Sequence, residues 1–260
     1  MAGNWSDLSA RFFSSLVMAA LGVAAIWAGG LWFAALAVAA AGTMIWELAV
    51  MSAPDARIRA LGLGASAAAL VCLAVLLGGF WAGLLAVPGL ALVVMARSAR
   101  LASGLYALAI MLASYGLIVF RADYGMVWLI WLVLVVVVTD VAGYFAGRFF
   151  GGPKFWPAIS PKKTWSGTLA GWGAAAGVGY VFLEFTTAGP DLPWISAGIA
   201  LASQMGDIAE SAIKRHAGVK DSSHLIPGHG GLLDRFDGLL GASLMMLVVA
   251  LVVVVPEIRM

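Results

Sequence analysis

Charged and histidine side chains gather in one segment, Ser203–Asp237, of a chain that is otherwise mostly apolar. The segment contains five of the thirteen carboxylates, four of the fifteen Lys and Arg residues and all three histidines. If it begins as a helix, its polar residues fall on one stripe: Ser203, Asp207, Glu210, Ser211 and Lys214. Lipid would not tolerate this stripe, so we expect it to face a polar interior.

The residues that follow have types and spacing suited to phosphate chemistry. Pro227–Gly231 reads PGHGG, which cannot form a regular helix and can expose backbone N–H groups to an anion. Asp234 and Asp237 lie three residues apart at the start of the last apolar run. Such carboxylates facing Asp207 across a cleft would suit Mg²⁺, which prefers oxygen ligands. Carboxylates that can bind a metal, together with Lys and Arg side chains that can bind phosphates, predict phosphoryl or nucleotidyl transfer. The alternative is a cytoplasmic loop held together by salt bridges.

Two further polar clusters precede this segment. Asp140 follows a valine run, and Tyr144 and Arg148 share its helical face, although a helix-end charge at the membrane surface would look the same. Gly143, Gly147 and Gly151 recur every four residues, which would let another helix approach closely. The second cluster, Ser160–Gly167, reads SPKKTWSG and places Lys162 and Lys163 before a helix, where membrane topology alone also favours lysine.

The composition predicts an all-α integral membrane protein. The chain is 63% hydrophobic and 11% charged, with a mean hydropathy of +1.00, whereas soluble domains have about 25% charged residues. Cys72 is the only cysteine, lies in an apolar run, and is expected to be a small core residue. No nucleic acid partner is indicated.

A spanning helix needs about 20 mostly apolar residues, and the chain has room for about nine. Residues 1–120 are predicted to form about five spans, with breaks at Gly29-Gly30 and Gly78-Gly79, and residues 121–260 a catalytic region of about four. The nine spans lie in these stretches: Phe12–Met51 (two), Ala60–Ala96 (two), Gly104–Val119, Gly125–Thr139, Gly167–Phe185, the run from Trp194, and Leu239–Val255.

Loop charges predict the orientation. With nine spans, thirteen of the fifteen Lys and Arg residues fall on one side, and only Arg121 and Arg259 on the other. Because basic loops stay in the cytoplasm, we expect a cytoplasmic N-terminus, a C-terminus on the opposite side, and both large polar loops in the cytoplasm.

At these residues the chain resembles the phosphatidate cytidylyltransferases, or CDP-diacylglycerol synthases. From Ser211 it reads S-AIKR-HAGV-KD-SSHLI-PGHGG-LL-DRFD, which matches the family signature, and SQMGD, SPKKTW and the Asp140…Tyr144…Arg148 pattern also fit. The resemblance covers roughly residues 140–240. Ser166 stands where the family usually has Glu, and its effect is left open.

The resemblance implies site residues, which we state as expectations. The catalytic set is Asp207, Lys214, Arg215, Lys220, Asp221, Asp234, Arg235 and Asp237. The metal ligands, for Mg²⁺, are Asp207 and Asp234, with Asp237 and Asp221 as weaker candidates. The substrate-binding set is Asp140, Tyr144, Arg148, Ser160, Lys162, Lys163, Thr164, Gln204, Ser211, Gly228, His229, Gly230 and Gly231. Whether a second, monovalent cation joins the Mg²⁺ is left open.

The implied reaction joins CTP and phosphatidic acid to give CDP-diacylglycerol and pyrophosphate for phospholipid biosynthesis. The implied setting is the bacterial inner membrane, with the active site on the cytoplasmic side and the chain as a homodimer. The alternatives are a CTP-dependent polyprenol or phytol kinase, a synthase for an ether lipid, and a secondary transporter.

Overall fold

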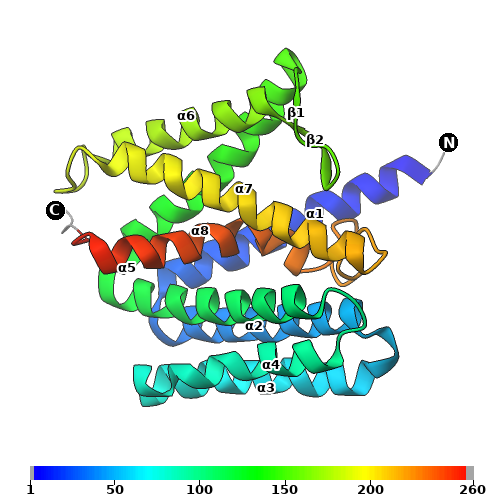
Figure 1. The fold of residues 1–260 in the computed structure, drawn as a ribbon. Helices are drawn as coiled ribbons and strands as arrows, with labels where there is room; N and C mark the ends of the chain where they lie inside the picture. The colour runs from blue at the N-terminus through cyan, green and yellow to red at the C-terminus, as the bar shows by residue number, and fades with distance from the viewer. Residues whose placement is uncertain (1–2, 256–260) are drawn as a thin grey trace. The chain divides into compact units, whose positions relative to one another are not determined.

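The computed structural model describes residues 3–255, and it describes side chains for residues 11–255. Its helices are α1 (Gly3–Ala28), α2 (Gly30–Ser52), α3 (Arg57–Leu77), α4 (Val87–Met95), α5 (Arg100–Phe150), α6 (Trp165–Phe182), α7 (Leu192–His216) and α8 (Leu233–Val252), as Figure 1 shows. Two 3-10 helices, η1 (Pro54–Ala56) and η2 (Gly79–Ala86), and an antiparallel hairpin, β1 (Lys154–Trp156) and β2 (Ser160–Thr164), complete it. The helical membrane fold expected from the composition is confirmed, with this small hairpin as an addition.

Within residues 3–255, five helices are long and apolar enough to cross a membrane. They are Arg11–Ala28, Gly30–Ser52, Pro54–Leu77, Arg100–Phe150 and Leu233–Val252, and Gly79–Met95 is a shorter apolar helix. The predicted count of nine spans is therefore not confirmed. Helix α5 consists of two segments that meet at a kink at Gly125, where two separate spans were predicted. Helix α7 carries polar residues throughout its second half. The orientation of the termini stays a prediction, and Arg259 lies outside the described residues.

Glycines break the apolar runs where the sequence predicted. Gly29 (φ 62°) separates α1 from α2, Gly78 (φ 87°) ends α3, and Gly125 (φ 85°) forms the kink in α5. A positive φ is easy only for glycine, because a side chain would clash with its own backbone. Glycine therefore permits the breaks at these three positions, although glycines such as Gly42 and Gly64 lie inside continuous helices.

The chain divides into two compact units. The first unit comprises the chain up to Val119 together with Ile213–Phe236, and the second comprises Phe120–Ala212 together with the chain from Asp237 on. The first therefore contains α1–α4, the start of α5 and the loop that leads into α8. The second contains the rest of α5, the hairpin, α6 and most of α7 and α8. The functional division at residue 120 stays a prediction.

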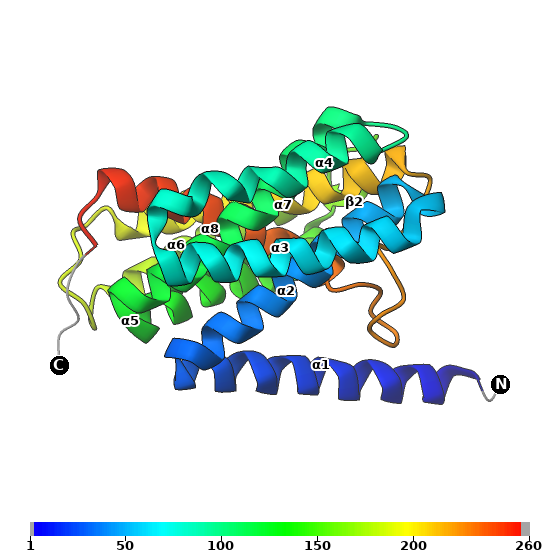
Figure 2. The ribbon, with the colours of Figure 1, turned by 90° about the horizontal axis from the view of Figure 1, so that it is seen from below.

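In the first unit, α2 packs lengthwise against α3, and the two lie side by side in Figures 1 and 2. A Cβ on Gly42 would lie 2.9 Å from the carbonyl oxygen of Gly64, and a Cβ on Gly64 would lie 2.7 Å from that of Gly42. The two backbones therefore touch directly, which is how small residues hold membrane helices together. Cys72, on α3, is exposed rather than buried, so its expected core position is wrong.

Replacing Gly64 by alanine should destabilise the protein by about 2 kcal/mol, because the added methyl overpacks this helix contact. The same substitution at Gly62, on the same helix, would meet nothing within 4 Å. It should instead be neutral or stabilise by up to about 1 kcal/mol, since alanine favours the helix. Thermal unfolding in detergent, followed by tryptophan fluorescence, measures both variants. Equal shifts of the unfolding temperature would contradict the proposed packing.

In the second unit, glycines again set the helix contacts. A Cβ on Gly143 of α5 would lie 3.2 Å from the carbonyl oxygen of Gly167 on α6, and one on Gly147 would lie 2.9 Å from Oγ1 of Thr164. The close approach expected at Gly143 and Gly147 is confirmed. Gly151 has nothing within 4 Å and a φ of 60°, so its place is just after the end of α5 rather than in a helix contact.

Candidate active site

The loop between α7 and α8 folds around glycine turns in the first unit. Gly228 (φ 74°) and Gly230 (φ 83°) adopt positive φ, and Ile226 pairs with Gly230. We call Pro227–Gly231 the glycine loop. The amide of His229 donates to the Ile226 carbonyl oxygen (2.9 Å) and that of Gly231 to Asp234 (2.7 Å). These two N–H groups are thus engaged within the loop itself.

A cavity of about 450 Å³ lies against the glycine loop, and we call it the loop cavity. Its lining residues are Arg11, Lys220, Asp221, His224, Ile226, Pro227, Gly228, His229, Gly230 and Arg235. Three of them are permanent cations and one is a carboxylate, so the cavity is basic and suits an anion. Lys220, Arg235 and the glycines, all predicted site residues, line this cavity together with Arg11, which the sequence indicated only as a topology signal.

Helix α1 is tied to the glycine loop through His229. Ser14 Oγ lies 2.8 Å from His229 Nδ1, and Ser15 Oγ lies 3.0 Å from Nε2. Arg235 of α8 also binds His229, because its Nε and Nη2 donate to the His229 carbonyl oxygen at 3.1 and 2.8 Å. Figure 2 shows this loop, in orange, reaching toward α1. Both ring nitrogens of His229 are therefore held by the protein.

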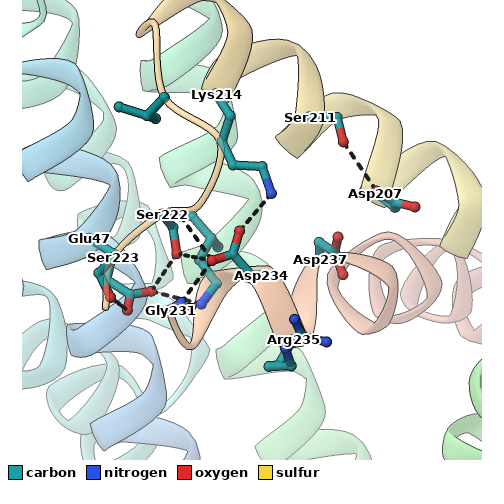
Figure 3. Close-up of polar contacts among 12 residues, drawn as sticks. Glu47, Asp207, Ser211, Lys214, Ser222, Ser223, Gly231, Asp234, Arg235 and Asp237 are labelled. Carbon is teal, nitrogen blue, oxygen red and sulfur yellow. Dashed lines mark hydrogen bonds and ion pairs between the residues drawn. The ribbon is translucent and has the colours of Figure 1, made fainter. Parts of the chain in front are cut away.

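Asp234, in the first turn of α8, is surrounded by donors. Lys214 Nζ lies 2.6 Å from its Oδ1, while the Ser222 amide (2.9 Å), Ser222 Oγ (2.9 Å) and the Gly231 amide (2.7 Å) donate to Oδ2. Figure 3 shows these bonds converging on the carboxylate. Lys214 and Asp234, two members of the predicted catalytic set, thus bond directly to each other. Because both oxygens of Asp234 already accept protein donors, its metal role stays a prediction.

Glu47 of α2 reaches the same loop and was missed by sequence reasoning. Its side chain is fully buried and accepts from the amides of Leu232 (2.9 Å) and Leu233 (2.7 Å) and from Ser223 Oγ (2.6 Å). The sequence does indicate this residue in one way, because Glu47 is a lone carboxylate inside the run Phe12–Met51. Burying a charge within a membrane span costs free energy, and such residues are usually functional.

A second cavity, of about 380 Å³, lies beside the hairpin in the second unit, and we call it the hairpin cavity. Its lining residues are Thr139, Asp140, Gly143, Tyr144, Gly147, Arg148, Lys162, Lys163, Thr164, Thr168 and Gln204. Arg148 Nη1 donates to the Tyr144 hydroxyl at 3.0 Å, as their spacing on one helix face predicted. Seven of the predicted substrate-binding residues thus meet in one place, from α5, the hairpin and α7.

The hairpin also shapes the start of α6. Thr164 accepts from the Gly167 amide (3.3 Å) and caps the helix, a common role for threonine. Ser166 Oγ lies 3.0 Å from Thr164 Oγ1 and also donates to the Gly151 carbonyl oxygen. Ser166 therefore joins the end of α5 to the start of α6. Ser160 lies in β2 but is not among the residues that line the hairpin cavity.

Asp207 of α7 and Asp237 of α8 belong to the second unit, where the two helices cross closely. Gly206 lies directly against the Asp237 carbonyl oxygen, and Gly241 against that of Ala202, so neither position has room for a side chain. Figure 3 labels both side chains, Asp207 on α7 and Asp237 on α8. Lys163 Nζ lies 2.5 Å from Asp207 Oδ2.

Smaller polar contacts orient each of these carboxylates. Ser211 Oγ donates to Asp207 Oδ1 (3.3 Å), and the Gly238 amide donates to Asp237 Oδ1 (2.7 Å). Gln204 accepts from Trp172 Nε1 (3.0 Å), which fixes its side chain between α6 and α7. Arg215 is exposed and donates to the Val219 carbonyl oxygen (3.1 Å), so it closes the end of α7.

Asp207 and Asp237 offer carboxylate oxygens, the ligand type that magnesium takes, and their metal role stays a prediction, as it does for Asp234. In residues 11–255, no three His, Cys, Asp or Glu side chains are arranged to hold a metal by themselves. Magnesium does not require such a cage, because it is commonly bound by one or two carboxylates, waters and substrate phosphates. Of the four predicted ligands, Asp207 and Asp237 lie in the second unit, and Asp221 and Asp234 in the first.

The fold and these cavities define a class: a helical membrane protein with basic cavities and with carboxylates on the polar parts of α7 and α8. The family model for the cytidylyltransferase family matches residues 9–255. A relative named phosphatidate cytidylyltransferase from Brucella suis biovar 1 (strain 1330) is 34% identical over an alignment of 264 residues, which covers 97% of both chains. A relative of the same name from Mycobacterium bovis (strain ATCC BAA-935 / AF2122/97) is 37% identical over 134 residues, covering 50% of this chain and 43% of its own. The chain therefore belongs to the cytidylyltransferase family.

Proposed function

We propose that this protein transfers CMP from CTP to phosphatidic acid, giving CDP-diacylglycerol and pyrophosphate. The observation that carries the proposal is the loop cavity, where Arg11, Lys220 and Arg235 surround a glycine turn as a triphosphate would require. The names of the relatives, phosphatidate cytidylyltransferase, support this choice of substrates.

Each of the two cavities binds one of the two anionic groups, the triphosphate of CTP or the phosphate of the lipid. Lys220 and Arg235 hold the triphosphate in the loop cavity and stabilise the departing pyrophosphate, while Lys214 holds Asp234 in place. Arg148, Lys162 and Lys163 in the hairpin cavity bind the lipid phosphate. The acyl chains of the lipid stay in the bilayer, so only the headgroup has to enter the protein.

The chemistry is one displacement at phosphorus. An oxygen of the lipid phosphate attacks the α-phosphorus of CTP, a new P–O bond forms, and the bond to the β-phosphate oxygen breaks. No general base is needed, because a phosphate monoester is already largely ionised near neutral pH. Catalysis then consists of orienting two anions and neutralising their charge.

A divalent ion bound by Asp207 and Asp237 would add charge neutralisation at the phosphates, and we propose magnesium because its ligands are oxygen atoms. The protein contributes the rest: Lys163 compensates Asp207, and Ser211 orients its carboxylate. The neighbouring Gly206 keeps the crossing of α7 and α8 tight enough to hold the two aspartates.

Purified protein with Mg²⁺, phosphatidic acid and CTP labelled at the α-phosphate should produce labelled lipid. A lipid kinase would label the lipid only from γ-labelled CTP, and a transporter would label it from neither. Omitting phosphatidic acid or adding a chelator of divalent cations should abolish the signal. Labelled lipid from γ-labelled CTP alone would overturn the proposed reaction.

We further propose that the hairpin faces the cytoplasm of a bacterial inner membrane, where CTP is available, and that the protein acts as a homodimer. In a Cys72→Ala background, Ala158→Cys in the hairpin turn should resist a membrane-impermeant maleimide in intact cells. Gly189→Cys, in the loop between α6 and α7, is the matched control and should react. Both sites are exposed and should react after permeabilisation. Labelling of residue 158 from outside would contradict this topology.

A further inference from the structure

Glu47 binds the start of α8 although it comes from α2, and the two lie 185 residues apart in sequence. Its Oε1 accepts from the Leu232 amide and Ser223 Oγ, and its Oε2 accepts from the Leu233 amide. These partners and the carboxylate are all in the first unit. Figure 3 shows Glu47 beside Ser222, Ser223 and Gly231.

The carboxylate acts as a helix cap supplied from another helix. The first N–H groups of any helix lack intrahelical partners, and the helix dipole favours a negative charge there. Leu233 is the first residue of α8 and Leu232 precedes it, so Glu47 satisfies two donors at this end. In return, these donors compensate a charge that would otherwise be very costly to bury.

Residue 231 has no room for a side chain because of this contact. A Cβ at residue 231 would lie 2.5 Å from Glu47 Oε1 and still closer to Ser222 Oγ. The last glycine of the glycine loop therefore makes room for a buried carboxylate. Gly228 differs, because its Cβ position lies 2.5 Å from Cγ of Arg11 on α1.

Two carboxylates thus organise the loop from its two sides. Asp234 binds the amides of Ser222 and Gly231, and Glu47 binds those of Leu232 and Leu233. Ser222 Oγ lies between them, 2.9 Å from Asp234 and 3.3 Å from Glu47. Its single proton can serve only one at a time, which couples the two carboxylates through one hydroxyl.

We propose that Glu47 is a positioning residue for nucleotide binding: it fixes the glycine loop and the first turn of α8, so that His229, Gly230 and Arg235 keep their places in the loop cavity. It touches no substrate. This role rests on the proposed function for its catalytic consequence, but the anchoring itself does not depend on activity.

Hydrogen exchange measured by mass spectrometry tests the anchor directly. In Glu47→Gln, the Leu232 and Leu233 backbone amides should exchange at least about tenfold faster. The glutamine side chain is uncharged, and its NH₂ group is a donor where Glu47 has a second acceptor oxygen. Peptides of α3 should not change. Thr43→Ala is the matched control on α2, since Thr43 Oγ1 bonds only the Ala39 carbonyl oxygen, and it should leave the loop unaffected.

Kinetics then distinguish positioning from general stability. In folded Glu47→Gln, KM for CTP should rise about tenfold while KM for phosphatidic acid stays unchanged, and Glu47→Asp should recover part of the loss. A lower folded yield with unaltered KM values would mean that Glu47 only stabilises the fold. Should Glu47→Gln not fold, Ser223→Ala removes one donor to Glu47 and should raise the same KM about threefold.

The outcomes separate the two proposals. Faster loop exchange in a protein that never makes labelled lipid would overturn the proposed reaction and leave the anchor standing. Active wild-type protein whose loop exchange and KM for CTP are unaffected by Glu47→Gln would overturn the positioning role and leave the reaction standing.

Discussion

Asp207→Asn should lower the rate of CMP transfer by about 1000-fold, as expected for loss of a charge that helps to hold a catalytic metal. Asp207 lies with Asp237 at the crossing of α7 and α8 and is paired with Lys163. Asparagine has nearly the same shape, so the helix crossing should survive while the negative charge is lost. The turnover number at saturating CTP and phosphatidic acid is the measurement.

Titration with Mg²⁺ sharpens this test. If Asp207 is a metal ligand, a higher Mg²⁺ concentration should recover part of the activity of Asp207→Asn, because a weakened site can still be filled by mass action. Asp123→Asn, an exposed carboxylate change on α5, is the matched control and should retain wild-type turnover. If Asp207→Asn kept more than half of the wild-type turnover, Asp207 would have no metal role.

Asp234→Asn should also reduce turnover, by about 100-fold or more, and for a physical reason that the structure makes visible. The carboxylate accepts four donors, including Lys214 at 2.6 Å. An asparagine would offer its NH₂ group to one of them and leave the buried Lys214 ammonium without a compensating charge. The glycine loop should therefore loosen. Steady-state kinetics and hydrogen exchange of Ser222 and Gly231 measure both effects.

Magnesium titration decides between the two roles of Asp234. A metal ligand, as the family resemblance implies, should give activity that recovers with added Mg²⁺, whereas a loop anchor should give activity that does not. A double-mutant cycle with Lys214→Met adds a second measure. If the two residues act as one ion pair, the double variant should be little worse than either single variant. Fully additive losses would mean that they act separately.

Much of the fold could be predicted because its physical causes are local. Apolar runs identify membrane helices, and glycine marks their breaks at Gly29, Gly78 and Gly125. The two spans predicted on either side of Gly125 correspond to the two helical segments of α5, which a kink at Gly125 separates. Local rules missed the hairpin, because a short strand such as Ser160–Thr164 is stabilised by its partner rather than by its own sequence.

The candidate site was predicted in part for the same reason. Asp140, Lys163 and Gln204, which belong to three separate clusters of predicted substrate-binding residues, line one cavity. Arg11 and Glu47 were not included, because each reaches the loop from a helix far away in the chain. Neither residue belongs to a local motif, and a single charge in an apolar run does not reveal its partner.

The sequence by itself determined that this is a helical membrane protein with one polar segment, and it predicted that this segment binds phosphate. Hydropathy, glycine breaks and the spacing of charged residues are properties of neighbouring residues, and neighbours are known without a structure. The tertiary structure alone decided which donors each carboxylate receives. Asp234 meets Lys214, Asp207 meets Lys163, and Glu47 caps α8. Such pairings depend on how distant helices pack, and packing depends on shape across the whole chain rather than on any single stretch of it.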